Sequence, residues 1–377
     1  MSGSPKRSAI LTATRVFARA APAPAISGRP RRGAAPDPPR SRSQRVRAPA
    51  SPRTAAGSGR TGRGLAWCGR HRVALTLAFL LVFPWIAPYQ ALAVNILVLG
   101  LYALGFNLLF GYTGLLSFGH AAFLGSGAYG CGIAIARYGL HPALALAAGT
   151  LLATLIAAVM GALAIRTRGI YFAMTTLALS MCVYYAFYQA EAFTGGENGL
   201  RGINVPALAL PGFSLNLLDP VVKYYAALAV VGVAVWLFSR LLSSPFGAAL
   251  EAIRENEGRA QACGYDARRM KLVAFVISGA LCGLAGGLQA IHLSIVPIET
   301  MHYATSGQAV MMALLGGMGT FFGPFVGAAT FALLQDGLAT VTSHWQLVVG
   351  AIFIAFVLFL PLGIWGEVLA RLRRAGW

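Results

Sequence analysis

The stretch EAIRENEGRAQACGYDARRMKLVAFVISGALCGLAGGLQAIHL, residues 251–293, decides the fold of this chain. It joins a charged, helix-compatible segment to an apolar run at residues 272–293. That run is long enough to cross a bilayer as a helix, which takes about 20 residues. Over the whole chain 57% of residues are hydrophobic and 11% are charged. This composition predicts a polytopic membrane protein and excludes a soluble globular domain.

Apolar segments recur along the chain after residue 72. We place ten, at residues 73–88, 91–110, 118–136, 141–165, 170–190, 223–243, 272–293, 306–317, 322–338 and 345–362. The eighth and ninth are shorter than the ~20 residues that a bilayer needs. We therefore expect an all-α, polytopic transmembrane helical bundle of about ten spans with discontinuous or short helices. In the seventh span, Gly279, Gly283 and Gly287 recur every four residues and predict a face for close helix packing.

Basic charge is concentrated at the N-terminal end. Residues 1–72 hold 16 Lys or Arg and one acid, Asp37, whereas the rest of the chain holds 14 basic and 10 acidic residues. Such a segment fits nucleic-acid or anionic-lipid binding, or an organelle transit peptide. It also fits a disordered extension that buries nothing, which we adopt, with no nucleic-acid partner. We thus expect a basic disordered extension (1–72), a transmembrane domain (73–366) and a cytoplasmic basic tail (367–377).

The remaining basic residues predict the orientation of the spans, because cytoplasmic loops carry an excess of Lys and Arg. Four clusters flank the spans: Arg70 and Arg72; Arg166 and Arg168; Arg254, Arg259, Arg268, Arg269 and Lys271; Arg371, Arg373 and Arg374. With ten spans, all four clusters fall on one side of the membrane. We therefore expect both termini to be cytoplasmic.

The charged segment between the sixth and seventh spans is predicted to be one amphipathic helix. Ser244–Pro245 resembles an N-cap followed by Pro at the first helical position, and Gly264 is suited to end the helix. Its key residues are Glu251, Arg254, Glu255, Asn256, Glu257, Arg259 and Gly264. A short polar helix is marginal in water without a partner. We therefore expect it to contact a soluble partner; the alternative is a solvated helix held by local interactions only.

Two glycine-rich segments interrupt apolar spans and are expected to line a substrate path. The residues concerned are Gly111, Tyr112, Thr113, Gly114, Ser117, His120 and Gly125 in the first segment and Gly316, Gly319 and Gly323 in the second. Broken helices in transporters place backbone groups at the substrate site, and polar residues at membrane depth favour function. The alternative is that the glycines only allow close helix packing and that His120 is a hydrogen-bonded packing residue.

The longest connection on the opposite side of the membrane, residues 191–222, is rich in turn-forming residues. Connections inside compact domains are usually much shorter. We therefore expect part of it to dock an extracytoplasmic partner, through Gly195, Gly196, Glu197, Asn198 and Arg201. The alternative is a simple connector.

The sequence holds no motif for chemistry. It lacks GxxxxGK[ST], HExxH, GxSxG and a Cys/His cluster, so we expect no catalytic residue, no metal site and no enzyme activity. The spans also lack an Asp/Glu/His relay of the kind that proton-coupled secondary transporters use. That class, and a channel, remain alternatives to a transporter driven through its cytoplasmic helix.

Six motifs together resemble a known family: GYTGLLSFGHAAFLGSGAYG, IYFAMTTLALSM, TGGENGLRGI, EAIRENEGRAQACGYDARRMKLVAFVISGALCGLAGGLQA, GGMGTFFGP and HWQLVVGAIFIAFVLFLPLGI. They are similar to the M-type permease subunit of branched-chain amino acid ABC importers, over about residues 75–366. Urea and short-chain amide permeases are similar too, so they stay an alternative for the substrate. The basic extension departs from the family, whose members usually start near the first span.

The resemblance implies a complex in the bacterial inner membrane. Its parts would be this chain, a second H-type permease, two cytoplasmic ATPase subunits that bind the ATP, an extracytoplasmic substrate-binding protein and membrane lipid. The chain itself would need no cofactor. The segment that matches residues 251–264 would be the coupling helix that sits in the ATPase groove, and transport would proceed by alternating access.

Overall fold

The computed structural model describes residues 80–81, 84, 89–203, 208–210, 213–215, 219–341, 344–360 and 362–374. The chain divides into two units, Met1–Ala56 and Gly57–Trp377, and every described residue belongs to the second. The predicted N-terminal extension and most of the first predicted span therefore lie outside the described residues.

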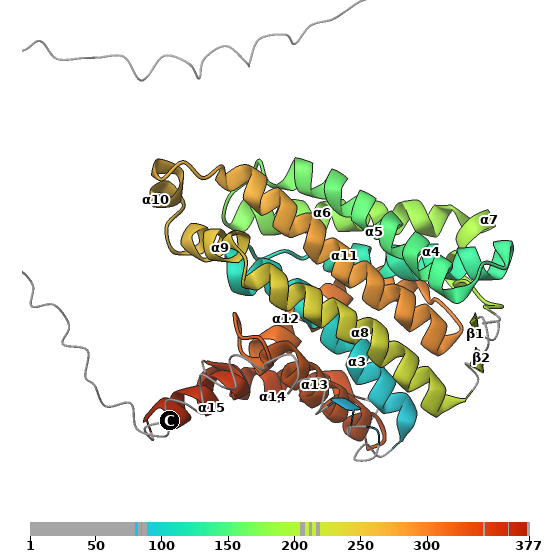
Figure 1. Ribbon diagram of the computed structural model, residues 1–377. Coiled ribbons are helices and arrows are strands. Elements are labelled where there is room, and N and C mark those ends of the chain that lie inside the picture. Colours follow the sequence, from blue (N-terminus) through green and yellow to red (C-terminus); the bar gives the residue numbers. More distant parts are fainter. Residues whose placement is uncertain are drawn as a thin grey trace, which may run out of the picture. The chain divides into compact units, whose positions relative to one another are not determined.

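The described part of the chain is almost entirely helical (Figure 1). The helices are α3 (Gln90–Asn107), α4 (His120–Tyr138), α5 (Pro142–Ala164), α6 (Ile170–Gln189), α7 (Glu191–Thr194), α8 (Pro220–Leu242), α9 (Pro245–Glu255), α10 (Glu257–Ala262), α11 (Ala267–Leu293), α12 (Tyr303–Gly316), α13 (Gly323–Ala339), α14 (Trp345–Phe359) and α15 (Gly363–Arg374). Two strands, β1 (Leu208–Leu210) and β2 (Phe213–Leu215), form a small antiparallel hairpin between α7 and α8. The prediction of an all-α membrane bundle is confirmed, with this hairpin as an addition.

Within the described residues, six helices are long and apolar enough to cross a membrane. They are Gln90–Tyr112, Pro142–Ala164, Ile170–Gln189, Pro220–Leu242, Ala267–Leu293 and Trp345–Arg371. The prediction of about ten spans is therefore not confirmed. α12 and α13 have 14 and 17 residues, or about 21 and 26 Å at 1.5 Å per residue. Each is shorter than the ~30 Å hydrocarbon core of a bilayer, which agrees with the expectation of short helices in this region.

α3 is the central helix of the bundle. α8, α11, α12 and α13 pack against it, and its residues from Leu92 to Asn107 are buried except Asn95. At its start, the Tyr89 hydroxyl donates a hydrogen bond to Asp336 on α13 at 2.5 Å. This bond raises the pKa of Tyr89, because ionising the phenol would lose it. The sequence around α3 is apolar on all faces, as expected for a helix surrounded by protein.

α4, α5 and α11 form a tightly packed group built on small residues. A Cβ atom at Gly279 or Gly283 of α11 would lie 2.3 or 2.2 Å from the Cβ atom of Ala157 or Ala153 on α5. One at Gly287 would lie 2.6 Å from Leu146 on the same helix. Side chains cannot approach this closely, so only glycine allows the observed packing. The predicted glycine face of this span is confirmed.

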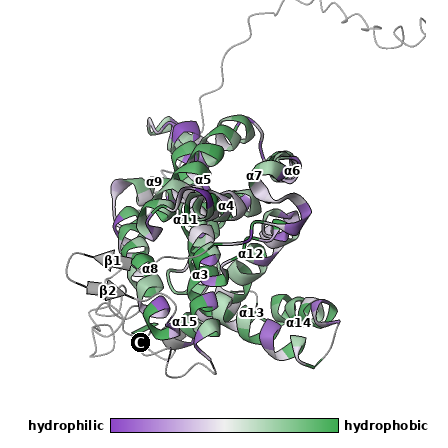
Figure 2. Cartoon of the chain, turned by 90° about the vertical axis from the view of Figure 1, so that its right-hand side faces the viewer, coloured by the Kyte–Doolittle hydropathy of each residue, from purple (hydrophilic) through white to green (hydrophobic). Residues whose placement is uncertain are grey.

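The outward faces of the bundle are apolar (Figure 2). Leu151 and Val159 on α5 are 61% and 63% exposed, and Leu358 on α14 is 73% exposed. Large aliphatic side chains are rarely so exposed and so clustered on soluble proteins. This surface is the one that a bilayer or another membrane subunit covers.

Candidate functional site

The charged segment between α8 and α11 forms two short helices, so the prediction of a single helix is wrong. Asn256 has extended backbone angles, φ −158° and ψ 103°, and separates α9 from α10. Its side-chain oxygen accepts a hydrogen bond from the Arg259 backbone N–H at 3.0 Å. This is the N-cap geometry that Asn favours, and it competes with an uninterrupted helix.

The predicted ends of the segment are confirmed. Ser244 has extended angles and Pro245 is the first residue of α9. Gly264 follows α10 with φ +90°, a conformation that side chains disfavour. Because glycine has no Cβ atom, it can adopt this left-handed conformation, and the helix ends where the sequence indicates.

α9 and α10 each bury one face and expose the other. Leu250 and Ile253 on α9 are buried, as is Ala260 on α10. The residues predicted to contact a partner lie mostly on the outer side: the charged Glu251, Arg254, Glu255 and Arg259 and the uncharged Asn256 and Gly264 are exposed, and Glu257 is half-buried. The helices are thus attached to the bundle by apolar contacts and present charges outward.

An ion pair ties α10 to the start of α11. Lys271 Nζ lies 2.9 Å from Glu257 Oε2, and the two side chains are 13% and 31% exposed. Because water reaches both groups only partly, the pair is less screened than a fully exposed one. Gln261 Nε2 also donates to Glu257 Oε1 at 3.4 Å.

A polar recess of about 850 Å³ lies beside these helices. It is bounded by residues 113–115, by the α5–α6 connection at residues 165–169, by α9 and α10, and by the start of α11. Its charged side chains are Arg166, Arg168, Arg254, Arg268 and Lys271 together with Glu255 and Glu257. Two of the basic clusters that the positive-inside rule assigned to one side of the membrane therefore meet at this end of the bundle.

The first glycine-rich segment is a helix break, as predicted. α3 ends in a π-helical turn, Leu108–Tyr112, a feature that often marks functional sites. Thr113 Oγ1 donates back to the Leu109 carbonyl, and Gly114 has φ +73°. The chain then continues without helical structure until His120.

The second glycine-rich segment is the turn between α12 and α13. Gly317 and Gly319 have φ of +111° and +69°. A Cβ atom at Gly316 would lie 1.8 Å from the Gly323 carbonyl oxygen. The turn is closed by Thr320 Oγ1, which donates to the Gly317 carbonyl at 2.7 Å and accepts from the Gly323 N–H at 3.1 Å. Glycine is therefore required here both for backbone angles and for close approach.

These two segments lie against each other, although about 200 residues separate them. Asn107, at the end of α3, accepts a hydrogen bond from the Gly319 N–H at 3.0 Å and donates one to the Thr320 carbonyl at 3.0 Å. Arg254 on α9 donates from Nη1 to the Gly111 carbonyl. The two glycine-rich segments of the sequence thus meet at a single place in the structure, in contact with α9.

The other residues of the first segment are packed inside the bundle. Tyr112 and Ser117 are buried. The buried His120 ring lies between Phe106 and Phe123, with Nε2 2.9 Å from Ser278 Oγ. A Cβ atom at Gly125 would lie 2.0 Å from Met301 Cγ. Their assignment to a substrate path stays a prediction.

The predicted docking residues of the 191–222 connection lie at the opposite end of the helices from α9 and α10, near α7 and the β1–β2 hairpin (Figure 1). Gly195 and Gly196 have φ of +80° and +57°. Between Gly196 and the bridge from Leu200 to Val296, a short 3-10 turn carries Glu197 and Asn198. The side chains of Glu197, Asn198 and Arg201 are exposed. The turn is therefore held by its backbone, and its polar side chains are available to a partner.

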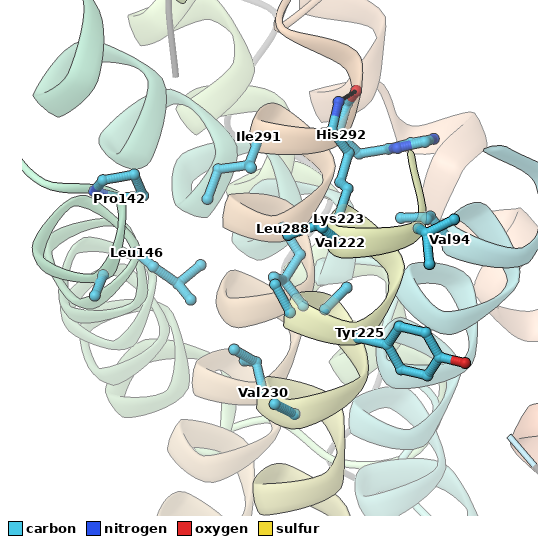
Figure 3. Close-up of a pocket in the computed structure, with 15 residues that line it drawn as sticks. Val94, Pro142, Leu146, Val222, Lys223, Tyr225, Val230, Leu288, Ile291 and His292 are labelled. Atoms are coloured by element: carbon cyan, nitrogen blue, oxygen red, sulfur yellow. Dashed lines mark hydrogen bonds between the residues drawn. The ribbon is translucent and has the colours of Figure 1, made fainter. Parts of the chain in front are cut away.

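A separate apolar groove of about 610 Å³ lies between α5, α8 and α11 (Figure 3). Aliphatic side chains such as Leu146, Val230 and Ile291 line it. Lys223 Nζ stands at one end, 3.5 Å from the His292 carbonyl oxygen. The groove belongs to the membrane-facing surface and contains none of the residues predicted from the sequence.

The family model described as "Branched-chain amino acid transport system / permease component" matches residues 89–357. The chain belongs to this family of permease components. The matched range covers both glycine breaks, α9 and α10, and the 191–222 connection. The chain is accordingly a multi-pass membrane protein of the ABC permease type.

Three relatives illustrate the range of this permease family. The high-affinity branched-chain amino acid permease LivM of Escherichia coli K12 is 30% identical over 280 residues, 69% of this chain and 66% of the relative. The probable branched-chain amino acid permease LivH of Methanocaldococcus jannaschii is 29% identical over 41% of this chain and 51% of its own length. The ribose import permease RbsC of Haemophilus influenzae is 27% identical over 34% and 41%.

The match to the Escherichia coli LivM permease spans just under two thirds of that relative's length. The LivM permease of Salmonella typhimurium is 29% identical over the same shares of both chains. No solved structure matches the chain.

The sequence analysis did not identify Asn107, which joins the two glycine breaks, as a candidate functional residue. An amide inside an otherwise apolar span is a signal for a specific hydrogen-bonding role, because a polar group at membrane depth needs partners. Its partners, Gly319 and Thr320, lie over 200 residues away, so no local pattern could have named them.

Proposed function

We propose that this chain is the M-type permease subunit of an ABC importer for branched-chain amino acids in the bacterial inner membrane. The observation that carries the proposal is the position of α9 and α10. They expose charged residues at one end of the bundle, and through Arg254 they touch both glycine breaks. A soluble partner that moves these helices would act directly on the places where the membrane helices are interrupted.

The proposed partners follow from the two ends of the bundle and its apolar sides. Two cytoplasmic ATPase subunits dock on the α9 ends of this chain and of an H-type permease, which packs against the apolar outer surface. The substrate-binding protein docks at the opposite end, on Glu197, Asn198 and Arg201, which are exposed there. The similarity to both LivM and LivH permeases supports a pairing of two related permeases.

The proposed mechanism is alternating access. ATP-driven closure of the ATPases displaces α9, and the breaks at Gly111–Gly114 and Gly316–Gly323 rearrange so that the substrate is released inward. α15 supports a cytoplasmic C-terminus, because its first residue, Gly363, packs on Gly317 next to the second break. The charged recess at this end supports the same orientation.

Charge reversal at the two ends of the bundle tests the proposal. In membranes that hold the whole importer, Glu251→Arg with Glu255→Arg should reduce co-purification of the ATPases at least about tenfold, which corresponds to about 1.4 kcal/mol of binding free energy. Leucine uptake should fall in parallel. Glu197→Arg with Arg201→Glu is the matched control, because it reverses two exposed charges at the other end.

The control variant should keep the ATPases bound and lose stimulation by the binding protein. ATPases that co-purify normally with the Glu251/Glu255 variant would rule out α9 as the docking helix. Competition of uptake by unlabelled leucine, urea and acetamide identifies the substrate class. Uptake blocked by urea but not by leucine would exclude the branched-chain assignment.

A further inference from the structure

Within the described residues, Arg254 is the α9 side chain that donates a hydrogen bond to a glycine break. Its Nη1 atom donates to the Gly111 carbonyl at the end of α3. The same atom lies 3.0 Å from where a Cβ atom of Gly319 would be, in the α12–α13 turn. Its Cγ atom lies 3.3 Å from where a Cβ atom of Gly114 would be. One side chain therefore touches both breaks.

The two breaks also leave no room to move past each other. A Cβ atom at Gly111 would lie 2.2 Å from Asn107 Oδ1 and 2.6 Å from the Gly319 nitrogen. A Cβ atom at Gly319 would lie 3.1 Å from the Gly111 carbonyl oxygen. The backbones at Gly111 and Gly319 are thus in direct contact, and Asn107, at the end of α3, holds the α12–α13 turn there by hydrogen bonds to Gly319 and Thr320.

The Gly111 carbonyl has a reason to need Arg254. It lies in the π-helical turn Leu108–Tyr112 that ends this helical segment, where carbonyl groups lack an N–H partner further along the helix. At the edge of a membrane such a carbonyl is costly to leave unbonded. A charged donor gives a stronger hydrogen bond than a neutral one, so the end of α3 is stabilised by a residue that belongs to α9.

We propose that Arg254 is a positioning residue that transmits displacement of α9 to both helix breaks at once, through its hydrogen bond to Gly111 and its contacts with Gly114 and Gly319. This rests on the proposed function only in naming the ATPases as the source of the displacement. The link between α9 and the breaks is a property of this chain alone. Withdrawal of the guanidinium leaves the Gly111 carbonyl without its donor and frees space beside Gly319.

Arginine is suited to this role because its two ends do different things. The methylene part packs on Gly114 while the planar guanidinium reaches a carbonyl and a second backbone segment. Glutamine and methionine both keep the Cγ atom, and both are two atoms shorter than arginine, so neither can keep the hydrogen bond to Gly111. Methionine also removes every donor.

The test compares Arg254→Met and Arg254→Gln with Arg268→Met in the full importer. Arg268 is an exposed cation that lines the same recess, and within the described residues its side chain makes no hydrogen bond to either break. Amide hydrogen exchange is measured in peptides covering residues 108–119 and 316–323. In both Arg254 variants, the amides of each of the two peptides should exchange about tenfold faster than in the wild type, because this hydrogen bond no longer opposes local opening. Arg268→Met should match the wild type.

Coupling gives the second readout. Leucine taken up per ATP hydrolysed should fall several-fold in Arg254→Met and Arg254→Gln while the ATPases still co-purify, and Arg254→Lys, which keeps a charged donor, should restore part of it. A merely structural role would lower both activities together. Should Arg254→Met fail to fold, Arg254→Gln carries the test.

Three outcomes would overturn the inference: unchanged exchange in both peptides, faster exchange in only one of them, or loss of the ATPases from the Arg254 variants. The last would make Arg254 part of the docking surface. Failure of the proposed function looks different, because the wild-type chain would then not retain the ATPases, and the exchange measurement would still decide whether Arg254 links the breaks.

Discussion

Replacing Gly327 by alanine should separate α12 from α13, whereas the same change at Gly337 of the same helix should not. A Cβ atom at Gly327 would lie 1.8 Å from the Met312 carbonyl oxygen and 2.9 Å from the Gly316 nitrogen. Both are backbone atoms and cannot rotate away. At Gly337 no atom lies within 4 Å of the added Cβ. The two substitutions thus make the same chemical change in the same helix. They differ only in whether the added Cβ atom meets the backbone of α12.

The magnitude follows from that distance. An ordinary contact of a Cβ atom is 3.4 Å or longer, so the helices must move apart locally by about 1.5 Å, and such overpacking costs about 1–3 kcal/mol. At both positions, alanine stabilises the helix by up to about 1 kcal/mol relative to glycine. We expect Gly337→Ala to be neutral or stabilising and Gly327→Ala to be less stable than it by about 1–3 kcal/mol, because the gain in helix propensity is common to both. At about 2 °C per kcal/mol, the melting temperatures should differ by about 2–6 °C.

Buried thiols provide the assay. Cys131 and Cys282 are buried, whereas Cys182 and Cys263 are exposed. After alkylation of the accessible thiols in the folded state, a thiol-reactive dye reports thermal unfolding of the purified permease through the buried pair. Equal melting temperatures for Gly327→Ala and Gly337→Ala would refute direct backbone contact between α12 and α13, and with it the close packing around the second break.

Three further predictions concern the break, the ion pair and the extension. Gly114→Val and Gly139→Val force a β-branched residue into left-handed backbone (φ +73° and +58°), so each variant should lose about 1–2 kcal/mol of stability. Only Gly114→Val should lower uptake per folded permease, and an equal loss of uptake in both variants would contradict a role for the break. Glu257→Gln removes the partner of Lys271 and should lower uptake modestly at low salt, with a smaller difference at high salt; salt-independent loss would argue against the ion pair. Deletion of residues 2–64 should leave membrane insertion and uptake intact, as measured by fractionation and leucine accumulation, because the segment holds little apolar sequence.

Local sequence signals predicted much of the fold. Hydropathy located the long helices α3, α4, α5, α6, α8 and α11 and the shorter α12, α13 and α14, because a helix surrounded by lipid or by apolar neighbours needs a long apolar stretch and little else. Gly279, Gly283 and Gly287 predicted close packing, since their spacing places them on one face. Pro245 and Gly264 marked the ends of the charged segment through backbone preferences that act within a few residues.

The number of spans was harder to predict from hydropathy. α4 is rich in Gly and carries His120 and Ser126, so its apolar character is diluted although it is buried in protein. α12 and α13 are too short to cross a bilayer alone, and they meet at Gly316 and Gly323. Hydropathy measures contact with lipid, whereas these helices are placed by contact with other helices.

Asn256 shows how one side chain can override a helical pattern. The sequence predicts one continuous helix through this position, whereas the structure places Asn256 in extended conformation as the cap of α10. Asparagine is nearly as favourable at an N-cap as any residue and unfavourable inside a helix. The sequence EAIRENEGRA was therefore compatible with both arrangements. In the arrangement with two helices, Ile253, Ala260 and Ala267 pack together in one small cluster.

The position of Arg254 makes the stability of one helix end depend on another element. Partners for Gly111 and Gly319 come from Arg254 and Asn107, at sequence separations of 143 and 212 residues. A helix that stops within a membrane protein must have its last carbonyls satisfied, and here the donor stands on a different segment, α9. A charged hydrogen bond contributes about 1.5–3 kcal/mol when its partner is shielded and less when water competes, as it does for the exposed Arg254. An energy of that size is large enough to bias the equilibrium between two arrangements of a glycine-broken helix. It follows that the break can hold one conformation while α9 is in place and change when α9 moves.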